Sequence, residues 1–478
     1  MRGFLSDLTP EKNSDVFEAS CGPLLGNIYR HNDKIVDGFL GIPFADPPAR
    51  FERAVAAKVW KNPRDCTHYG SGCPQAGPFE NMKEQMGLQF DEHNCLKLNV
   101  FAPRWKKPNE FPNGYPVMVN IFGGGFEMGT SAAYDAYSIS GTLPLKDIVV
   151  VTINYRVGVF GFLTIGDTCP GNLALWDQTL ALEWVQKHIA QSRIFEEFAI
   201  ANGYTSATKS LLEWYKEQPV DVLTTIGSFN FSISGFMACS PNLDGVFFEK
   251  PIEELRKEAP KKSFMVGGTE YEGLIMAVPD PVYSRIGDKI DVSAKKLFGS
   301  DVVEDSEKVI CELRRRYMSG VDETDEKAVR KRFIEFLGDV VFNCGIVKTA
   351  KSCSETENTV YLYSFDYCNP DGYGQLGNLL DFKASNHGND FRYVMGDGGF
   401  ERFHPSEEER NVMEFMAILY SNFAKTGNPN SEELEGNWEP FCKEHPGRYF
   451  KIDFPRSEMK ENYQNGRLEM LEDIEHYH

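Results

Sequence analysis

The chain has 478 residues, of which 41% are hydrophobic, so it holds enough apolar material for one large domain or two ordinary ones. Its formal net charge is -20. This balance excludes nucleic acid and an anionic membrane surface as expected partners, since both require clustered Lys and Arg.

The N-terminus, residues 1–10, lacks the apolar stretch of a signal peptide, and the chain contains no apolar run long enough for a membrane span. We therefore expect a soluble cytoplasmic protein, or a secreted one if the N-terminus is incomplete. The cysteines and histidines lack the close spacing of a zinc site, so we expect no metal and no cofactor.

In chain order, residues 1–20 are polar and unpatterned and predict a loose N-terminal arm. Short apolar runs at 22–29 and 34–40, separated by turn residues, predict a small antiparallel sheet. Three prolines at 43–48 predict a stiff extended loop, because proline is excluded from central strands and helix interiors. Residues 95–101 predict the next strand.

Cys73 and Cys95 bracket a polar, glycine-containing segment. Their spacing suits a disulfide that closes a surface loop, worth about 3 kcal/mol by loop-closure entropy. In a reducing compartment both would be thiols.

Residues 115–121 predict a short apolar strand that runs directly into Gly123, Gly124 and Gly125. Glycines in such a turn bring backbone N–H groups close to a ligand, and convergent N–H groups stabilise a negative oxygen. The alternative is a tight turn without chemistry. The β-branched run at 147–155 then predicts a strand that is buried on both faces.

A helix is predicted from Asn172, its N-cap, to about Gln191. In a doubly wound fold the next element should be another parallel strand. Instead, the sequence predicts two further helices, at 192–203 and 206–218. The alternation of strand and helix therefore breaks at Gln191/Ser192.

The alternation resumes with a predicted strand at 263–268, followed by Glu272 in Tyr271-Glu272-Gly273. Charged helical segments are expected over 303–355 and a strand over 359–365. The remaining predicted elements are a helix over 407–425 that ends before Gly427 and Pro429, a strand over 448–453, and a polar helical tail.

Taken together, these segments resemble the type-B carboxylesterase family of α/β-hydrolases over about residues 21 to 470. The resemblance rests on ordered motifs that are spread along the chain. They are Phe39-Leu40-Gly41-Ile42-Pro43-Phe44-Ala45-Asp46-Pro47-Pro48, Asn94-Cys95-Leu96-Lys97-Leu98-Asn99-Val100-Phe101, Asn154-Tyr155-Arg156-Val157-Gly158-Val159-Phe160-Gly161-Phe162-Leu163, Gly171-Asn172 with Asp177-Gln178, Tyr271-Glu272-Gly273, Asn386-His387-Gly388 and Asn422-Phe423-Ala424-Lys425-Thr426-Gly427-Asn428-Pro429-Asn430. The resemblance implies an α/β-hydrolase fold with a mostly parallel central sheet flanked by helices, forming one domain over 21–478.

The family's chemistry is acyl transfer by a Ser-His-Glu triad. By match of motif, the resemblance makes Glu272 the triad acid, His387 the general base, and Gly124 and Gly125 two donors of the oxyanion hole. The imidazole takes the serine proton, the carboxylate holds its tautomer, and the N–H groups stabilise the tetrahedral oxyanion.

The nucleophile is missing, because no Gly-x-Ser-x-Gly occurs anywhere in the sequence. Three serines resemble part of this motif: Ser131 follows the glycines, and Ser232 and Ser234 precede Gly235. None of them lies in a sequence that predicts a strand, an elbow and a helix. We infer an internal deletion near 191–192 that removes a central strand, the elbow, its helix and a third oxyanion N–H. The strands beside the absent one should each lose a ladder partner.

Two smaller departures from the family pattern concern a salt bridge and the substrate. His93 and Asn94 stand where the family usually has two acidic residues, which counts against a structural salt bridge there. The loop between Cys73 and Cys95 has no tryptophan, which counts against choline esters as substrates.

Three hypotheses follow. The first is an inactive member of the esterase family. The second is a serine carboxylic ester hydrolase whose full-length product contains the missing segment and acts on a small carboxylic ester. The third is a hydrolase-like module that binds a protein partner.

Overall fold

The structure is a computed structural model that describes residues 11–12, 16–46, 49–75, 88–105, 114–165, 171–189, 244–277, 290–298, 306–373, 382–397, 403–432 and 437–468, with isolated residues at 108, 241, 377, 380 and 434. The chain divides into two compact units. Unit 1 comprises Met1–Ile252 and Met395–Phe400, and unit 2 comprises Glu253–Val394 and Glu401–His478. Within the described ranges, no helix combines the length and apolarity that crossing a bilayer requires.

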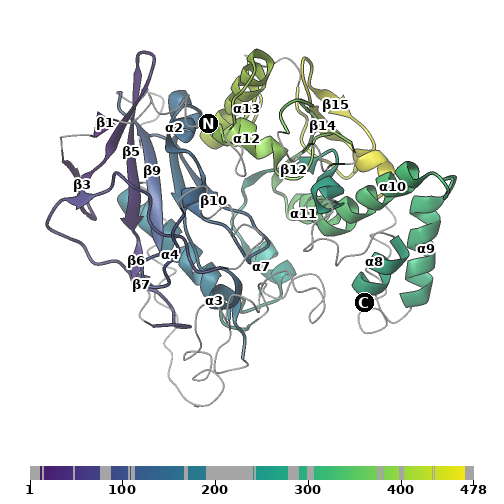
Figure 1. Ribbon diagram of the computed structural model, residues 1–478, viewed down its shortest axis with the longest axis horizontal. Coiled ribbons are helices and arrows are strands. Elements are labelled where there is room, and N and C mark those ends of the chain that lie inside the picture. The colour runs from purple at the N-terminus through teal and green to yellow at the C-terminus, as the bar shows by residue number, and fades with distance from the viewer. Residues whose placement is uncertain are drawn as a thin grey trace. The chain divides into compact units, whose positions relative to one another are not determined.

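The largest sheet of unit 1 has six strands in the order β1-β4-β5-β9-β11-β10, drawn in purple and blue in Figure 1. Its β10–β11 pair is parallel, and its other neighbouring strands are antiparallel. The strands of the unit are β1 (Glu11–Lys12), β2 (Phe17–Ala19), β3 (Gly22–Leu25), β4 (Asn27–His31), β5 (Lys34–Pro43), β6 (Ala45–Asp46), β7 (Val55–Ala56), β8 (Arg64–Asp65), β9 (Lys97–Pro103), β10 (Val117–Ile121) and β11 (Val149–Ile153). Its helices and helical turns are η1 (Ser131–Ala133), α2 (Ala136–Ser140), η2 (Leu143–Lys146), α3 (Gly158–Phe162) and α4 (Leu173–His188).

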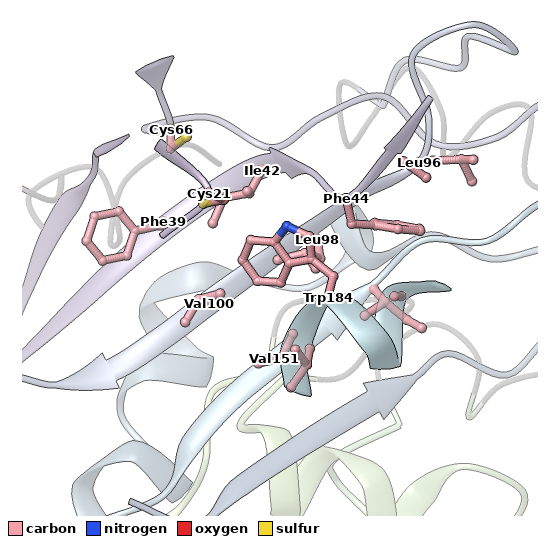
Figure 2. Packing of buried hydrophobic residues seen from close by; sticks show 14 of the residues in the cluster. Cys21, Phe39, Ile42, Phe44, Cys66, Leu96, Leu98, Val100, Val151 and Trp184 are labelled. Carbon is pink, nitrogen blue, oxygen red and sulfur yellow. The ribbon is translucent and has the colours of Figure 1, made fainter. Parts of the chain in front are cut away.

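Helix α4 contributes to the main hydrophobic core of unit 1 (Figure 2). Its Trp184 and Val185 belong to the same buried cluster as Val100 of β9 and Val151 of β11. All five residues of β11 are buried. This burial confirms the prediction of a strand that is covered on both faces, for which β-branched residues are well suited.

The sheet of unit 2 has four strands in the order β12-β13-β14-β15, with the first three parallel and β15 antiparallel. The strands are β12 (Ser263–Thr269), β13 (Thr359–Phe365), β14 (Tyr449–Ile452) and β15 (Glu458–Lys460). The helices and helical turns are α7 (Ile252–Glu258), which begins at the unit boundary, η4 (Glu272–Ala277), α8 (Ile290–Leu297), α9 (Ser306–Met318), α10 (Glu326–Gly338), the π-helical turn η6 (Asp339–Asn343), α11 (Cys344–Glu355), α12 (Asn389–Met395), α13 (Glu407–Thr426) and η8 (Tyr463–Gly466). Helix α11 packs against β12 and β13.

Helix α13 forms over the whole range that the sequence predicts and continues one residue further, to Thr426. Its N-terminus carries a capping box, in which Ser406 accepts from the N–H of Glu409 and Glu409 accepts from the N–H of Ser406. At the other end, the N–H of Gly427 donates to the carbonyl of Phe423 over 2.7 Å. These local signals were readable without the fold, because they depend on residues only three or four positions apart.

Several boundaries differ from the sequence predictions. The predicted loose arm contributes β1 and β2 to the sheets of unit 1. Strand β5 continues to Pro43, into the predicted proline loop. Helix α4 ends at His188, and Asn172 occupies its N-cap in a left-handed conformation without a side-chain cap bond. Part of the predicted helical tail forms β15 and η8, because Met459 and its neighbours pair with β14.

The two candidate site segments each follow a strand at the end of a sheet. Among the described strands, β10 pairs only with β11, and β12 pairs only with β13. Neither edge strand is as buried as its partner. Both sheets are mixed, and their parallel pairs lie next to these open edges. The predicted helices at 192–203 and 206–218, and the junction Gln191/Ser192, lie outside the described residues.

Candidate active site

A carboxylate and an imidazole form a pair in unit 2. Oε2 of Glu272 lies 2.7 Å from Nδ1 of His387. Because a carboxylate can only accept, the imidazole donates from Nδ1 and leaves Nε2 to take up a proton. The Glu272 side chain is 5% exposed and that of His387 is 50% exposed.

The end of β12 sets the position of Glu272. The N–H of Thr269, the last residue of the strand, donates to Oε1 of Glu272 over 2.6 Å. A Cβ at Gly268 would lie only 2.7 Å from the same oxygen. Glycine at this position therefore leaves the space that the carboxylate fills.

The loop that carries His387 is joined to the Glu272 loop through its backbone. The N–H of Tyr271 donates to the carbonyl of Ser385 over 2.9 Å, and Tyr271 forms a parallel bridge with Asn386. The bridged residues each immediately precede one member of the pair. This arrangement fixes the two loops in register exactly where Glu272 and His387 follow, although 115 positions separate them in the chain.

The charges around His387 favour its protonated form. Burial alone would lower the pKa of His387, but its hydrogen bond to Glu272 and the charges of Glu272 and Asp390 raise it above the ordinary value. Burial, together with the charge of Glu272, also raises the pKa of Asp390. The hydroxyl of Tyr363 donates to Asp390 over 3.2 Å. Sequence reasoning missed Asp390, although it lies three positions after His387.

The glycine turn follows β10 in unit 1. Gly124 and Gly125 have φ values of 142° and 60°, and a Cβ at Gly124 would lie 2.1 Å from the carbonyl oxygen of Met128. Only glycine fits such a backbone approach. Among the hydrogen bonds of the described residues, none is donated by the N–H of Gly124 or Gly125. Both N–H groups are suited to bind an anion.

Buried amides hold the segment after the glycine turn. Oδ1 of Asn154 accepts from the N–H of Ser131 over 2.8 Å, and Nδ2 of Asn154 donates to the carbonyl of Cys95 over 3.1 Å. The side chain of Asn99 donates to the hydroxyl of Ser131 over 3.1 Å. Ser131 is thus a buried structural residue of this loop.

Cys73 and Cys95 form a disulfide between two buried side chains, closing a loop with a sequence separation of 22. We expect the double variant Cys73→Ala/Cys95→Ala to lose about 3 kcal/mol of unfolding free energy, because the unfolded chain gains entropy. Urea unfolding of the oxidised protein checks this value. The exposed Cys311 supplies the control, since Cys311→Ala should leave the midpoint in place. An unchanged midpoint in the double variant would contradict the prediction.

Two ion pairs support unit 1. Arg50 binds Glu92 through two hydrogen bonds of 2.9 and 2.7 Å, so a salt bridge forms although His93 and Asn94 replace the usual acids. The carboxylate of this salt bridge comes from Glu92, the residue immediately before His93. Arg156 binds Asp177 through two bonds of 2.7 Å, and the Asp177 side chain is fully buried.

These features define the class of the protein: an α/β protein of mixed sheets covered by helices, with a carboxylate–imidazole pair at the end of a parallel strand. The chain belongs to the carboxylesterase family, whose model matches residues 13–192 and 191–471. It therefore has an α/β-hydrolase fold, as the sequence motifs predicted.

Known esterases are similar to this chain over most of its length. Esterase cest-33 of Caenorhabditis elegans is 44% identical over 536 residues, which cover 99% of this chain and 97% of that protein. The medium-chain fatty acyl-CoA hydrolase precursor of Anas platyrhynchos is 27% identical, covering 90% and 86%. Carboxylesterase 3 of Homo sapiens is 28% identical, covering 90% and 85%.

The structure therefore brings together the predicted acid and base, and it places the two glycines predicted as oxyanion donors in a turn of unit 1, where both have positive φ values. Among the described residues, no group of three or more His, Cys, Asp or Glu is arranged to hold a metal ion.

Proposed function

We propose that this carboxylesterase-family chain keeps the oxyanion loop, the triad acid Glu272 and the triad base His387, lacks the serine nucleophile, and is inactive toward carboxylic esters. The observation that carries the proposal is the absence of Gly-x-Ser-x-Gly from all 478 residues. Without the serine no acyl-enzyme can form, and the oxyanion donors alone support only slow hydrolysis.

The open edges of the two sheets support the inferred deletion. The strand that normally carries the serine would be a parallel central strand, and its removal leaves two parallel strands without a ladder partner. Strands β10 and β12 are end strands of this kind among the described residues. The glycine turn follows β10 in unit 1, and Glu272 follows β12 in unit 2.

The serine that follows the glycine turn gives no substitute nucleophile. Ser131 is 2% exposed, and its hydroxyl accepts from Asn99. The buried hydroxyl of Ser131 is bound by the amide of Asn99 and not by an imidazole that could take its proton. Ser232 and Ser234 lie outside the described residues.

A second candidate is an active serine esterase whose full-length product includes the missing segment. The two ranges matched by the family model meet at 191–192, at the inferred deletion. The similarity to the C. elegans esterase extends over more residues than this chain possesses, so that relative has stretches without a counterpart here. Sequencing of transcripts across Gln191/Ser192 separates the two candidates, since the second requires a transcript with the segment.

The test of inactivity combines a fluorophosphonate probe with a chromogenic short-chain ester such as p-nitrophenyl butyrate. We expect no stoichiometric labelling and a hydrolysis rate equal to that of the His387→Gln variant. A serine esterase serves as the positive control, and cooperative thermal unfolding establishes that the sample is folded. Labelling of one serine, located by peptide mass spectrometry, would overturn the proposal.

If the chain is inactive, its expected ligand is a protein partner and no longer a small ester. Binding of a protein partner is a function of the retained fold that requires neither a nucleophile nor a leaving group. Affinity capture from native lysate, compared with a heat-unfolded sample of the same chain, provides the corresponding measurement.

A further inference from the structure

A buried polar network in unit 2 centres on Asp339, which is fully buried. Its carboxylate accepts from Tyr317 over 2.9 Å, from Asn343 over 2.9 Å, and from Nε of Arg467 over 2.7 Å. Arg467 also donates to Oε1 of Gln464 over 3.0 Å. Every oxygen of the carboxylate is thus occupied, which offsets the cost of burying its charge.

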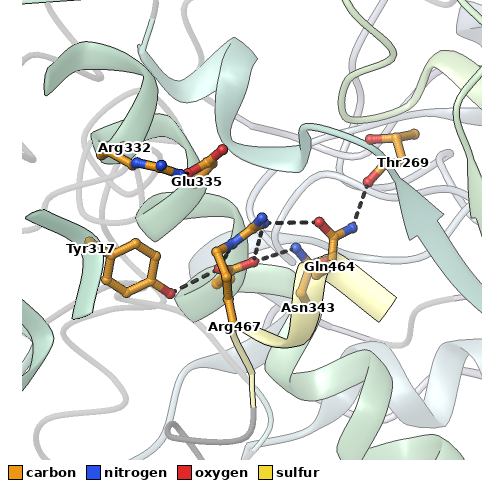
Figure 3. Close-up of polar contacts among 8 residues, drawn as sticks. Thr269, Tyr317, Arg332, Glu335, Asn343, Gln464 and Arg467 are labelled. Carbon is orange, nitrogen blue, oxygen red and sulfur yellow. Dashed lines mark hydrogen bonds and ion pairs between the residues drawn. The ribbon is translucent and has the colours of Figure 1, made fainter. Parts of the chain in front are cut away.

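One arm of the network reaches the backbone that holds Glu272. Nε2 of Gln464 donates to the carbonyl of Thr269 over 3.3 Å, as Figure 3 shows. The N–H of the same residue, Thr269, donates to Oε1 of Glu272. The peptide groups on the two sides of Thr269 are therefore both held, one by Gln464 and the other by the carboxylate of Glu272.

The other arm reaches the face of His387. Asp339 is the first residue of the π-helical turn η6, which ends at Asn343. Phe342 of this turn stacks on the imidazole of His387, with ring centroids 4.4 Å apart and an interplanar angle of 25°. Because Asp339 binds Asn343, it holds both ends of the turn that presents Phe342. A π-helical turn inside a helix commonly marks a functional position.

The turn that supplies Gln464 and Arg467 has an unusual backbone. Asn462, Gln464 and Asn465 have φ values of 63°, 52° and 56°. Non-glycine residues in this region cost free energy and persist only where surrounding contacts impose them. The contacts of Gln464 with Thr269 and of Arg467 with Asp339 are contacts of that kind.

We propose that Gln464 and Phe342 are positioning residues for the Glu272–His387 pair, one acting on the acid through Thr269 and the other on the base through its ring. The inference deepens the proposed function, on which it rests for the roles of Glu272 and His387. Because the network lies within unit 2, it operates whether or not a nucleophile is present.

The test measures the pKa of His387 by NMR in protein labelled with ¹³C-histidine, with the His387→Gln variant assigning its signal among the nine histidines. The variants are Gln464→Met, which keeps the length but removes the donor, and Phe342→Leu, which removes the ring. The hydrogen bond and charge of Glu272 raise the pKa of His387, so loosening the pair should lower it by about half a unit or more.

The control is Arg332→Gln, which breaks the 2.6 Å bond between Arg332 and Glu335 in the same unit but touches neither Thr269 nor Phe342. It should leave the pKa of His387 unchanged, and Phe342→Tyr should retain the native value.

If Gln464→Met and Phe342→Leu unfold cooperatively and keep the native pKa, the positioning role is wrong. If only one of the two variants folds, the pKa of His387 in that variant decides the test, and a native value overturns the proposal. This measurement needs no ester turnover, so it can fail independently of the proposed inactivity.

Discussion

On the proposed function, insertion of the strand, elbow and helix that we infer to be deleted between Gln191 and Ser192 should convert this chain into a serine esterase. We expect kcat/KM for p-nitrophenyl butyrate to rise by roughly 10³-fold or more, because the nucleophile acts together with a base that is already present. The insert is the segment that spans the Gly-x-Ser-x-Gly elbow of an active serine carboxylesterase.

Two controls make the insertion informative. Replacing the inserted serine by alanine should remove the gain, and His387→Gln in the restored chain should remove it to a similar extent, since triad members act as a unit. A restored chain that unfolds cooperatively but neither labels with a fluorophosphonate nor turns over ester would contradict the assignment of Glu272 and His387 as a competent acid and base.

The substitution Asp177→Ala should lower the unfolding free energy by about 3–5 kcal/mol, because it leaves the buried guanidinium of Arg156 without its carboxylate. Arg156 also donates to the carbonyl of Glu52 over 2.8 Å, so removal of the carboxylate disturbs both the contact of Arg156 with α4 and its contact with Glu52. Urea unfolding followed by tryptophan fluorescence measures the loss.

The matched control for this experiment is Glu323→Ala in unit 2, which removes one carboxylate partner of Arg314. The side chains of that pair are 42% and 58% exposed. Water screens such a pair, so the expected loss is below about 1 kcal/mol. Equal losses in the two variants would mean that the burial of Asp177 does not determine its contribution.

Much of the fold followed from local patterns. The strand at 359–365 forms over exactly the predicted range, and the helix predicted over 407–425 extends by one residue, to Thr426. Both elements are specified by residues within a few positions of each other, through β-branched composition in one and cap residues in the other. The motifs around Glu272 and His387 were readable for the same reason.

Pairings between distant segments were less accessible to sequence reasoning. The polar residues Glu11–Lys12 form β1 because they pair with the edge of β4. No local sequence pattern predicts this pairing. Glu458–Lys460 becomes a strand because β14 lies beside it. In both places tertiary pairing overrides a weak local preference.

The sequence by itself determined the family and the lack of a Gly-x-Ser-x-Gly elbow, and it predicted Glu272 and His387 as the acid and base, because each of these depends on residues that are adjacent in the chain. Only the tertiary structure decided what surrounds the acid–base pair. Thr269, Phe342, Asp390 and Gln464 come from separate elements of unit 2. Thr269 binds Glu272, Phe342 stacks on His387, the charge of Asp390 acts on His387, and Gln464 binds Thr269. A parallel sheet joins strands through long crossovers, so residues far apart in sequence meet at one edge.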